Sequence, residues 1–353
     1  GDQTPFEDLE RNIKEWQGIV LLVCFGAFAL FVVLIHRIIR TYIYYDAHLL
    51  DTFFDGGGDI NFALIAAAVV AKWTWTTSFT WSTMEVQRFG LVGHFWFAAG
   101  SVIQLFLFAI VVCEIRIKAP GAKTYLQVIR ARYGAVPHIV LMCFALFANI
   151  VIAGMVMTEG TRILTNLTED LDHEVTAIIL AIVIAFFTVV GGVGGGIYVS
   201  YFSAVLLLSI VLYYVCDVFF DPLGRDGNIL GDKEEIYDLV KCGKADPDND
   251  DYSALTFLSR DGMIQGILII LSSFSSIFVN QSFWQTGIAG KPVHSVWGFI
   301  MGGLVWFAVP FCSAYAFGMA YWALAIRDKG GVHFVIDDDV KNGLLPVYIS
   351  WEL

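Results

Sequence analysis

Eight stretches of this sequence are long and apolar enough to cross a lipid bilayer. A helix of about 20 apolar residues covers the roughly 30 Å of hydrocarbon. Because the bilayer core offers no water to exposed backbone groups, such stretches are expected to form helices that pack as a bundle. The sequence therefore predicts an all-α polytopic membrane protein. The stretches are residues 18–35, 60–81, 95–113, 136–158, 175–192, 197–220, 263–284 and 296–326.

Composition supports a membrane protein and argues against other classes. Of the 353 residues, 57% are hydrophobic and 15% are charged, whereas soluble domains carry about 25% charged residues. The net charge of −12 comes from acids between the apolar stretches, and no basic segment suits nucleic acid. The longest polar segment, about 40 residues, is too short for a soluble catalytic domain. Since no catalytic constellation or metal-type cysteine spacing emerges, we expect neither an enzyme nor a cofactor.

Basic residues predict the orientation in the membrane. The segment after the third stretch is rich in Lys and Arg against one acid, Glu114, which places it in the cytoplasm. Counting alternately, the N-terminus is extracellular, and so are the acidic segments 162–174, 221–261 and 327–353. We expect a multi-pass protein of the plasma membrane that is glycosylated at Asn166, in an outer sequon. The basic residues are Arg116, Lys118, Lys123, Arg130 and Arg132.

Three connecting segments have patterns of their own. Residues 118–133 carry apolar and basic faces, which predicts a cytoplasmic helix along the membrane surface. Residues 221–260 contain few apolar side chains and the run ADPDNDD, which predicts a mobile outer loop. The glycines within residues 191–196 predict a tight hinge between the fifth and sixth helices.

The second stretch is unusual for a membrane helix. It reads AVVAKWTWTTSFTWSTM over residues 68–84, with Lys72 near mid-membrane and tryptophans interleaved with hydroxyl residues. One interpretation is a broken helix that lines a water-filled site and binds a polar solute and a cation. The other is a helix packed inside the bundle, whose hydroxyls bond its own carbonyls. An ionisable group inside the membrane favours function, but the residues alone leave both interpretations open.

The end of the seventh stretch is also rich in polar groups. It reads SSFSSIFVNQSFWQ over residues 272–285. The pattern fits a second broken helix that faces the same site, and it fits equally a helix hydrogen-bonded to its neighbours.

An ordered set of motifs spans nearly the whole chain, from residue 26 to residue 346. The most specific is GGLVWFAVPF, and no other motif is decisive by itself. In this order the motifs resemble the solute:sodium symporter family and, within it, the urea active transporters of plants, fungi and algae. The set comprises KWTW (72–75), FWFAAG (95–100), EIRIKAPGAKT (114–124), VIRARYG (128–134), TVVGG (188–192), SY (200–201), FVNQSFW (278–284) and GGLVWFAVPF (302–311).

The resemblance implies a leucine-transporter-like bundle of two inverted five-helix repeats, preceded by one helix. The stretches 60–81 and 263–284 would open the two repeats, each broken at the midplane. With about 8 transmembrane helices, the second repeat is expected to be truncated and the chain incomplete. The expected segments are an extracellular N-terminus (1–16), a leading helix (17–40), the first repeat (60–220), an acidic outer loop (221–260), the first two helices of the second repeat (261–326) and an outer, truncated end (327–353).

The same resemblance implies which residues bind the solute and the cation. The backbone carbonyls of Ala71 and Thr74 match the first-helix half of a sodium site, so Na+ is the metal that we expect if one binds. Lys72 stands where the family usually has Ser or Gln, and its ammonium would replace or repel the cation. Asn280 replaces a common Asp, and Thr286 replaces a common basic residue. The expected substrate-binding residues are Trp73, Thr74, Trp75, Ser78, Gln104, Ser275, Gln281 and Trp284.

The resemblance further implies a secondary active transporter that imports urea, or a similar small polar solute, with H+ or Na+ by alternating access. The expected partners are that solute and membrane lipid, and not nucleic acid. Two alternatives stay open: a urea sensor that no longer transports, and a permease for polyamines or another small solute. Few acids lie at the midplane, which favours a neutral solute over a polyamine.

Overall fold

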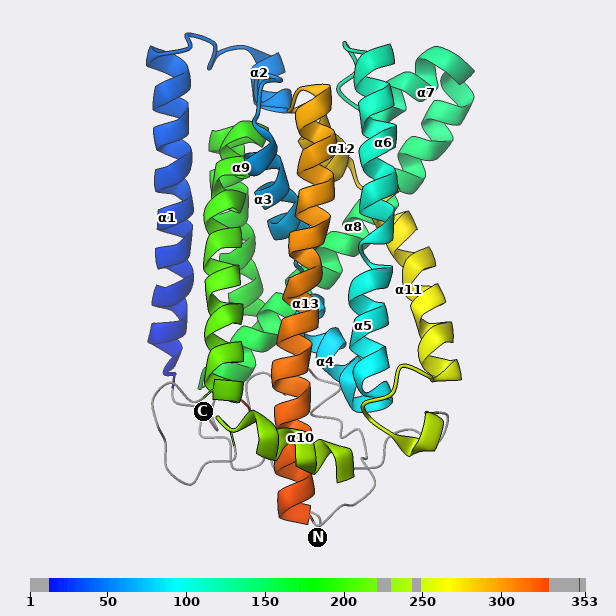
Figure 1. Ribbon diagram of the computed structural model, residues 1–353. Helices are drawn as coiled ribbons and strands as arrows, with labels where there is room; N and C mark the ends of the chain where they lie inside the picture. Colours follow the sequence, from blue (N-terminus) through cyan, green and yellow to red (C-terminus); the bar gives the residue numbers. More distant parts are fainter. Residues whose placement is uncertain (1–12, 170, 221–229, 243–248, 330–348, 350–353) are drawn as a thin grey trace.

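The computed structural model describes residues 13–169, 171–220, 230–242, 249–329 and 349. Within these residues the protein is a bundle of helices, and its β-pairs are isolated bridges. Among the described residues, six helical spans are long and apolar enough to cross a membrane if α5 and α6 are counted together (Leu91–Lys118), or seven if the bent pair α3 and α4 is also one span. The predicted all-α membrane bundle is therefore confirmed (Figure 1). The helices are α1 (Glu15–Tyr42), α2 (Leu50–Asp55), α3 (Phe62–Trp73), α4 (Thr77–Phe89), α5 (Leu91–Gly100), α6 (Ile103–Lys118), α7 (Tyr125–Tyr133), α8 (Ala135–Leu167), α9 (His173–Phe220), α10 (Lys233–Cys242), η1 (Asp250–Tyr252), α11 (Arg260–Val279), α12 (Gln281–Ile288) and α13 (Pro292–Lys329).

Helix α9 contains the fifth and sixth predicted stretches and reverses direction between them. Gly192, at φ 58° and ψ −159°, interrupts its helical backbone. A Cβ at this position would lie 2.7 Å from the Phe53 carbonyl oxygen, so glycine meets both the positive φ and the close approach. A straight helix of 48 residues would measure about 72 Å, more than twice the hydrocarbon thickness. The predicted glycine hinge is confirmed.

Two helices are interrupted, as expected for helices that open two repeats. α3 and α4 meet at a 62° bend, and Asn280 separates α11 from α12 with extended backbone. The Ser282 N–H donates to Asn280 Oδ1 at 2.9 Å, which caps the start of α12. In Figure 1, α3 and α4 descend while α11 and α12 ascend, which is the opposite orientation that inverted repeats require.

Helix α13 crosses the centre of the bundle and packs on α3, α4, α5 and α6. A Cβ on Gly298 would lie 2.5 Å from Ile65 Cγ2, and one on Gly302 would lie 2.8 Å from Val69 Cβ. Small residues on one helix face let two membrane helices approach closely. The glycine that opens the GGLVWFAVPF motif therefore keeps α3 tight against the bundle centre.

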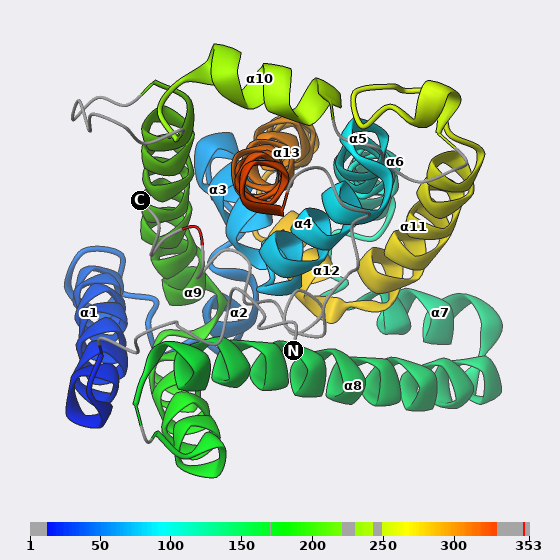
Figure 2. The ribbon, with the colours of Figure 1, turned by 90° about the horizontal axis from the view of Figure 1, so that it is seen from below.

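Helix α10 lies along one edge of the lower part of the bundle, beside α13, where the sequence predicted a mobile loop (Figure 2). Its Ile236 and Val240 are buried in one cluster with Trp322 of α13. The prediction of a loop over residues 221–260 is wrong for this segment, because its apolar residues recur at helical spacing among the acids. Residues 221–229 and 243–248 of the predicted loop lie outside the described residues.

Helices α7 and α8 form one side of the bundle. α7 confirms that residues 118–133 contain a helix, and none of its residues is fully buried. α8 runs along the edge of the bundle in Figure 2, and only Ala145 and Thr161 among its residues are buried. Asn166, the predicted glycosylation site, lies half-buried near the end of α8. Most of the α8 surface is therefore not covered by the other described residues.

Candidate functional site

The break between α3 and α4 frees backbone carbonyls inside the span. In a continuous helix the Trp75 N–H would donate to the Ala71 carbonyl, but here it donates to Ser78 Oγ at 3.1 Å. The Ser78 N–H donates to the Trp75 carbonyl at 2.9 Å rather than to that of Thr74. Among the described residues, neither the Ala71 nor the Thr74 carbonyl receives a hydrogen bond. Both oxygens are therefore available to a cation or to the N–H groups of a solute.

Side chains satisfy the remaining open groups at the break. Ser78 Oγ donates to the Trp73 carbonyl at 3.4 Å, and Trp75 Nε1 donates to the Lys72 carbonyl at 2.9 Å. The Thr74 hydroxyl bonds back to the last turn of α3. The structure thus brings together four of the predicted substrate-binding residues, Trp73, Thr74, Trp75 and Ser78. Their mutual bonds fix the shape of the break without using the two free carbonyls.

The two tryptophans at the break differ in their surroundings. Trp73 is 6% exposed, and its Nε1 donates to the Ser101 carbonyl at 2.9 Å. Its ring lies 5.4 Å from Trp75, 5.5 Å from Phe283 and 5.9 Å from Trp306, measured between centroids. Trp75 is only partly buried. Trp73 therefore anchors the break in the core, while the Trp75 ring keeps part of its surface exposed.

Lys72 connects the first broken helix to the second. Its Nζ donates to Thr286 Oγ1 at 2.7 Å and to the Ser282 carbonyl at 3.3 Å, both on α12. Thr286 Oγ1 itself donates to the same Ser282 carbonyl at 2.8 Å. Among the described residues, no carboxylate forms an ion pair with Lys72. The ammonium of Lys72 thus bonds Thr286, the position at which the family resemblance implies a basic residue.

The other four predicted substrate-binding residues lie on α6, α11 and α12 and form no hydrogen bond with the break among the described residues. Gln104 is fully buried on α6, and neither its Oε1 nor its Nε2 has a hydrogen-bond partner among the described residues. Ser275 is exposed on α11, and Gln281 Nε2 donates to the Lys123 carbonyl at 3.2 Å. Trp284 Nε1 donates to a carbonyl of its own segment. Within the described residues, no bond or ring contact of Ser275, Gln281 or Trp284 reaches the break.

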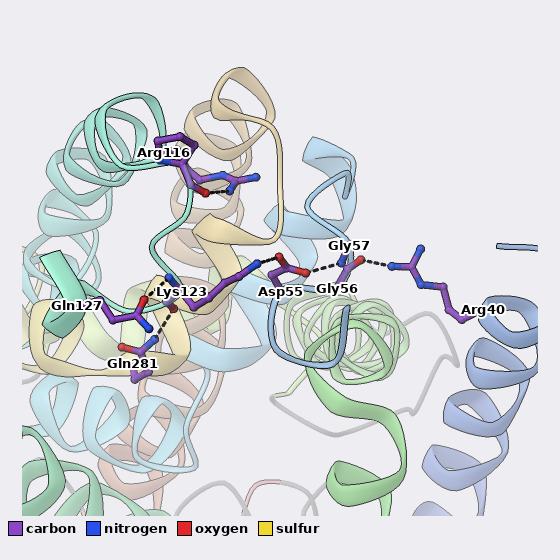
Figure 3. Close-up of polar contacts among 9 residues, drawn as sticks. Arg40, Asp55, Gly56, Gly57, Arg116, Lys123, Gln127 and Gln281 are labelled. Carbon is purple, nitrogen blue, oxygen red and sulfur yellow. Dashed lines mark hydrogen bonds and ion pairs between the residues drawn. The ribbon is translucent and has the colours of Figure 1, made fainter. Parts of the chain in front are cut away.

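A chain of polar contacts joins the segments at the upper end of the bundle, which include residues 43–59 and 119–134 (Figure 3). Asp55 pairs with Lys123, and its Oδ1 accepts the Gly57 N–H at 2.9 Å. Arg40 Nη2 donates to the Gly56 carbonyl at 2.7 Å. These contacts join α1, the segment after α2 and the connection between α6 and α7. Gln281, through the Lys123 carbonyl, adds the start of α12 to the chain.

Sequence reasoning missed two acids, Asp55 and Glu85, whose side chains the structure places in contacts with distant parts of the chain. Asp55 was indistinguishable from other polar residues near a helix end, because its partner Lys123 is distant in the sequence. Glu85 falls after residue 81, where the apolar stretch was expected to end, although α4 continues to Phe89. Charge within a helix that packs inside the bundle would have been the signal for Glu85.

Comparison with known proteins identifies the family. Residues 53–281 match the Sodium:solute symporter family. The chain is 32% identical over 273 residues to "Probable urea active transporter 1" of Schizosaccharomyces pombe, covering 76% of this chain and 40% of that protein. It is 30% identical over 326 residues to "Urea-proton symporter DUR3" of Oryza sativa subsp. japonica, covering 87% of this chain and 44% of that protein.

A solved structure of a Na+-coupled sialic acid symporter is similar with a TM-score of 0.49 and 13% identity, covering 95% of this chain and 78% of that chain. The chain spans less than half the length of the curated relatives that it matches. The family match covers well over half of this chain and includes the break, Lys72 and the start of α12. The chain belongs to the sodium:solute symporter family.

Proposed function

We propose that the protein imports urea, or a similar small polar solute, across the plasma membrane by secondary active transport with H+ or Na+. The observation that carries the proposal is the break between α3 and α4, with its two unbonded carbonyls. Relatives named as urea transporters support urea as the solute. In this proposal the lower end of the bundle, where α1 begins, faces the outside.

The chemistry of the break suits a neutral, planar solute. Urea presents four N–H bonds and one carbonyl oxygen, so its site needs several acceptors, a donor and flat walls. The carbonyls of Ala71 and Thr74 are the acceptors, and the partly buried indole of Trp75 is a flat wall. Breaks of this kind in membrane helices are stable only where they line a cavity or are buried in protein.

The cation would bind beside the solute. Backbone carbonyls at a helix break are typical ligands for a coupling ion, and they attract H3O+ or Na+ alike through their dipoles. Lys72 points its ammonium away from the break, toward α12. Its charge, on the residue next to Ala71, weakens cation binding at the free carbonyls, while its hydrogen bonds are made to α12 instead.

Uptake of labelled urea into vesicles that contain the purified protein tests this function. We expect uptake above that of empty vesicles, and faster uptake when an inward gradient of H+ or Na+ is imposed. Excess unlabelled urea should compete, and putrescine, as a polyamine, should not. Equal uptake with and without either gradient would contradict symport, and competition by putrescine would contradict the solute class.

A further inference from the structure

A second ionisable side chain lies inside the broken span, on the lower side of the break. Glu85 on α4 is completely buried, with an exposed fraction of 0%. Its Oε1 accepts two hydrogen bonds, from Trp81 Nε1 at 3.0 Å and from Gln265 Nε2 at 3.2 Å. Its Oε2 has no hydrogen-bond partner among the described residues. One oxygen thus joins α4 to α11, and the other is left unbonded.

The negative charge of an ionised Glu85 has no ion-pair partner among the described residues. Arg88, one turn further along α4, is the charged side chain whose field reaches the carboxyl, but it is exposed and forms no ion pair with it. On the packed helices, α5 carries His94, and the middle and lower parts of α13 carry Cys312, Tyr315, Tyr321 and Arg327. α11 bonds Glu85 through the neutral Gln265 and has Arg260 and Asp261 at its start. Among the described residues, Glu85 forms no ion pair with any of these groups, and its two bonding partners are neutral.

The two protonation states of Glu85 bind α11 with different strength. Hydrogen bonds to a carboxylate are about twice as strong as those to a neutral acid. An ionised group inside a membrane is costly without a partner, which favours the neutral state. The ionised state strengthens the bond from Gln265, and the neutral state weakens it. Proton binding at Glu85 is therefore linked to the contact between the outer halves of the two broken helices.

We propose that the Glu85 carboxyl binds the proton that is coupled to solute transport, with Oε2 as the protonated atom. The inference rests on the proposed function and assigns its coupling ion. A proton from water at the lower end forms an O–H bond at Oε2 and neutralises the carboxylate. The bond to Gln265 weakens, so that α4 and α11 can separate and admit the solute. After the bundle rocks, Oε2 returns the proton to water on the other side, and nothing is oxidised or reduced.

The Glu85→Gln variant tests the inference in vesicles. An amide can still accept from Trp81 and Gln265, but it cannot bind or release a proton. One coupled proton and a gradient of one pH unit allow about tenfold accumulation of urea in the wild type. We expect Glu85→Gln to lose this accumulation and to retain urea exchange, which needs no net proton movement, within about twofold of the wild type. Glu159→Gln, on the edge helix α8, should leave both activities unchanged.

Infrared spectroscopy gives a readout that does not depend on transport. The wild type should show a protonated-carboxyl band that titrates with pH and is lost in Glu85→Gln; Glu85→Asp should retain a shifted band. Accumulation by Glu85→Gln equal to the wild type, or an unchanged band, would overturn the inference. Loss of urea accumulation in Lys72→Gln, with accumulation retained in Glu85→Gln, would overturn it as well. A wild type without any urea exchange would instead refute the proposed function, and the band would still decide whether Glu85 titrates.

Discussion

The ion pair between Asp55 and Lys123 gives the upper end of the bundle a measurable stability. The Lys123 side chain is 28% exposed and that of Asp55 is 11% exposed. Exposed ion pairs contribute about 0–1 kcal/mol, and breaking a buried pair costs about 3–5 kcal/mol. This pair lies between the two classes, and Asp55 would keep its bond from the Gly57 N–H. We therefore expect Lys123→Met to lower the free energy of unfolding by about 2 kcal/mol.

A double-mutant cycle separates the pair from other effects of the substitutions. Reversible unfolding in mixed micelles would be measured for Lys123→Met, Asp55→Asn and the double variant. We expect a coupling energy of about 1–2 kcal/mol. Lys118→Met is the matched control, because Lys118 pairs with Glu114 one turn away while both side chains are largely exposed. Its effect should stay below about 0.5 kcal/mol.

The result that would refute this reasoning is a coupling energy no larger than the effect of the control. The Asp55–Lys123 contact would then be an ordinary surface pair that does not stabilise the upper end of the bundle. The Gln281 bond would survive in every variant, because it goes to the backbone of residue 123 and not to its side chain.

Two further predictions concern the central helices. Gly302→Ala would place a Cβ 2.8 Å from Val69 Cβ and should destabilise the bundle by about 1–3 kcal/mol. Gly154→Ala, with no neighbour within 4 Å, is the control and should have no such effect. Equal melting temperatures of the two variants would contradict the packing argument. Lys72→Gln removes the ammonium near the free carbonyls, so we expect Na+ to stimulate the uptake of labelled urea more strongly in this variant than in the wild type. If uptake by the variant is no faster in Na+ than in choline, the charge of Lys72 does not oppose cation binding.

The sequence predicted the architecture well because bilayer physics leaves few choices. Apolar length predicted the spans, and glycine content predicted the hinge that lies at Gly192. The polar residues near Lys72 and Asn280 indicated interruptions, although a packed helix remained an equal alternative until the bend was seen. The helix α10 was missed because acids dominate its composition while a few apolar residues decide its packing.

The site could be predicted only in part, because side-chain partners are not encoded in local pattern. A tryptophan can form either a solute-facing wall or a packed anchor, and local sequence does not decide between them. The burial of Trp73 and its bond to the Ser101 carbonyl separate its surroundings from those of Trp75. Ser275 looked like its neighbours in a polar run, yet it faces outward. Glu85 became visible only when α4 was seen to continue inside the bundle.

The most direct test of the account is equilibrium binding of labelled urea to the purified protein. The account places the solute at the break, against the partly exposed indole of Trp75. Trp75→Ala should therefore raise the Kd for urea at least about tenfold, equivalent to about 1.4 kcal/mol. Trp297→Ala, which removes an indole on the exposed face of α13, should leave the Kd unchanged. An unchanged Kd in Trp75→Ala would contradict a urea site at the break between α3 and α4.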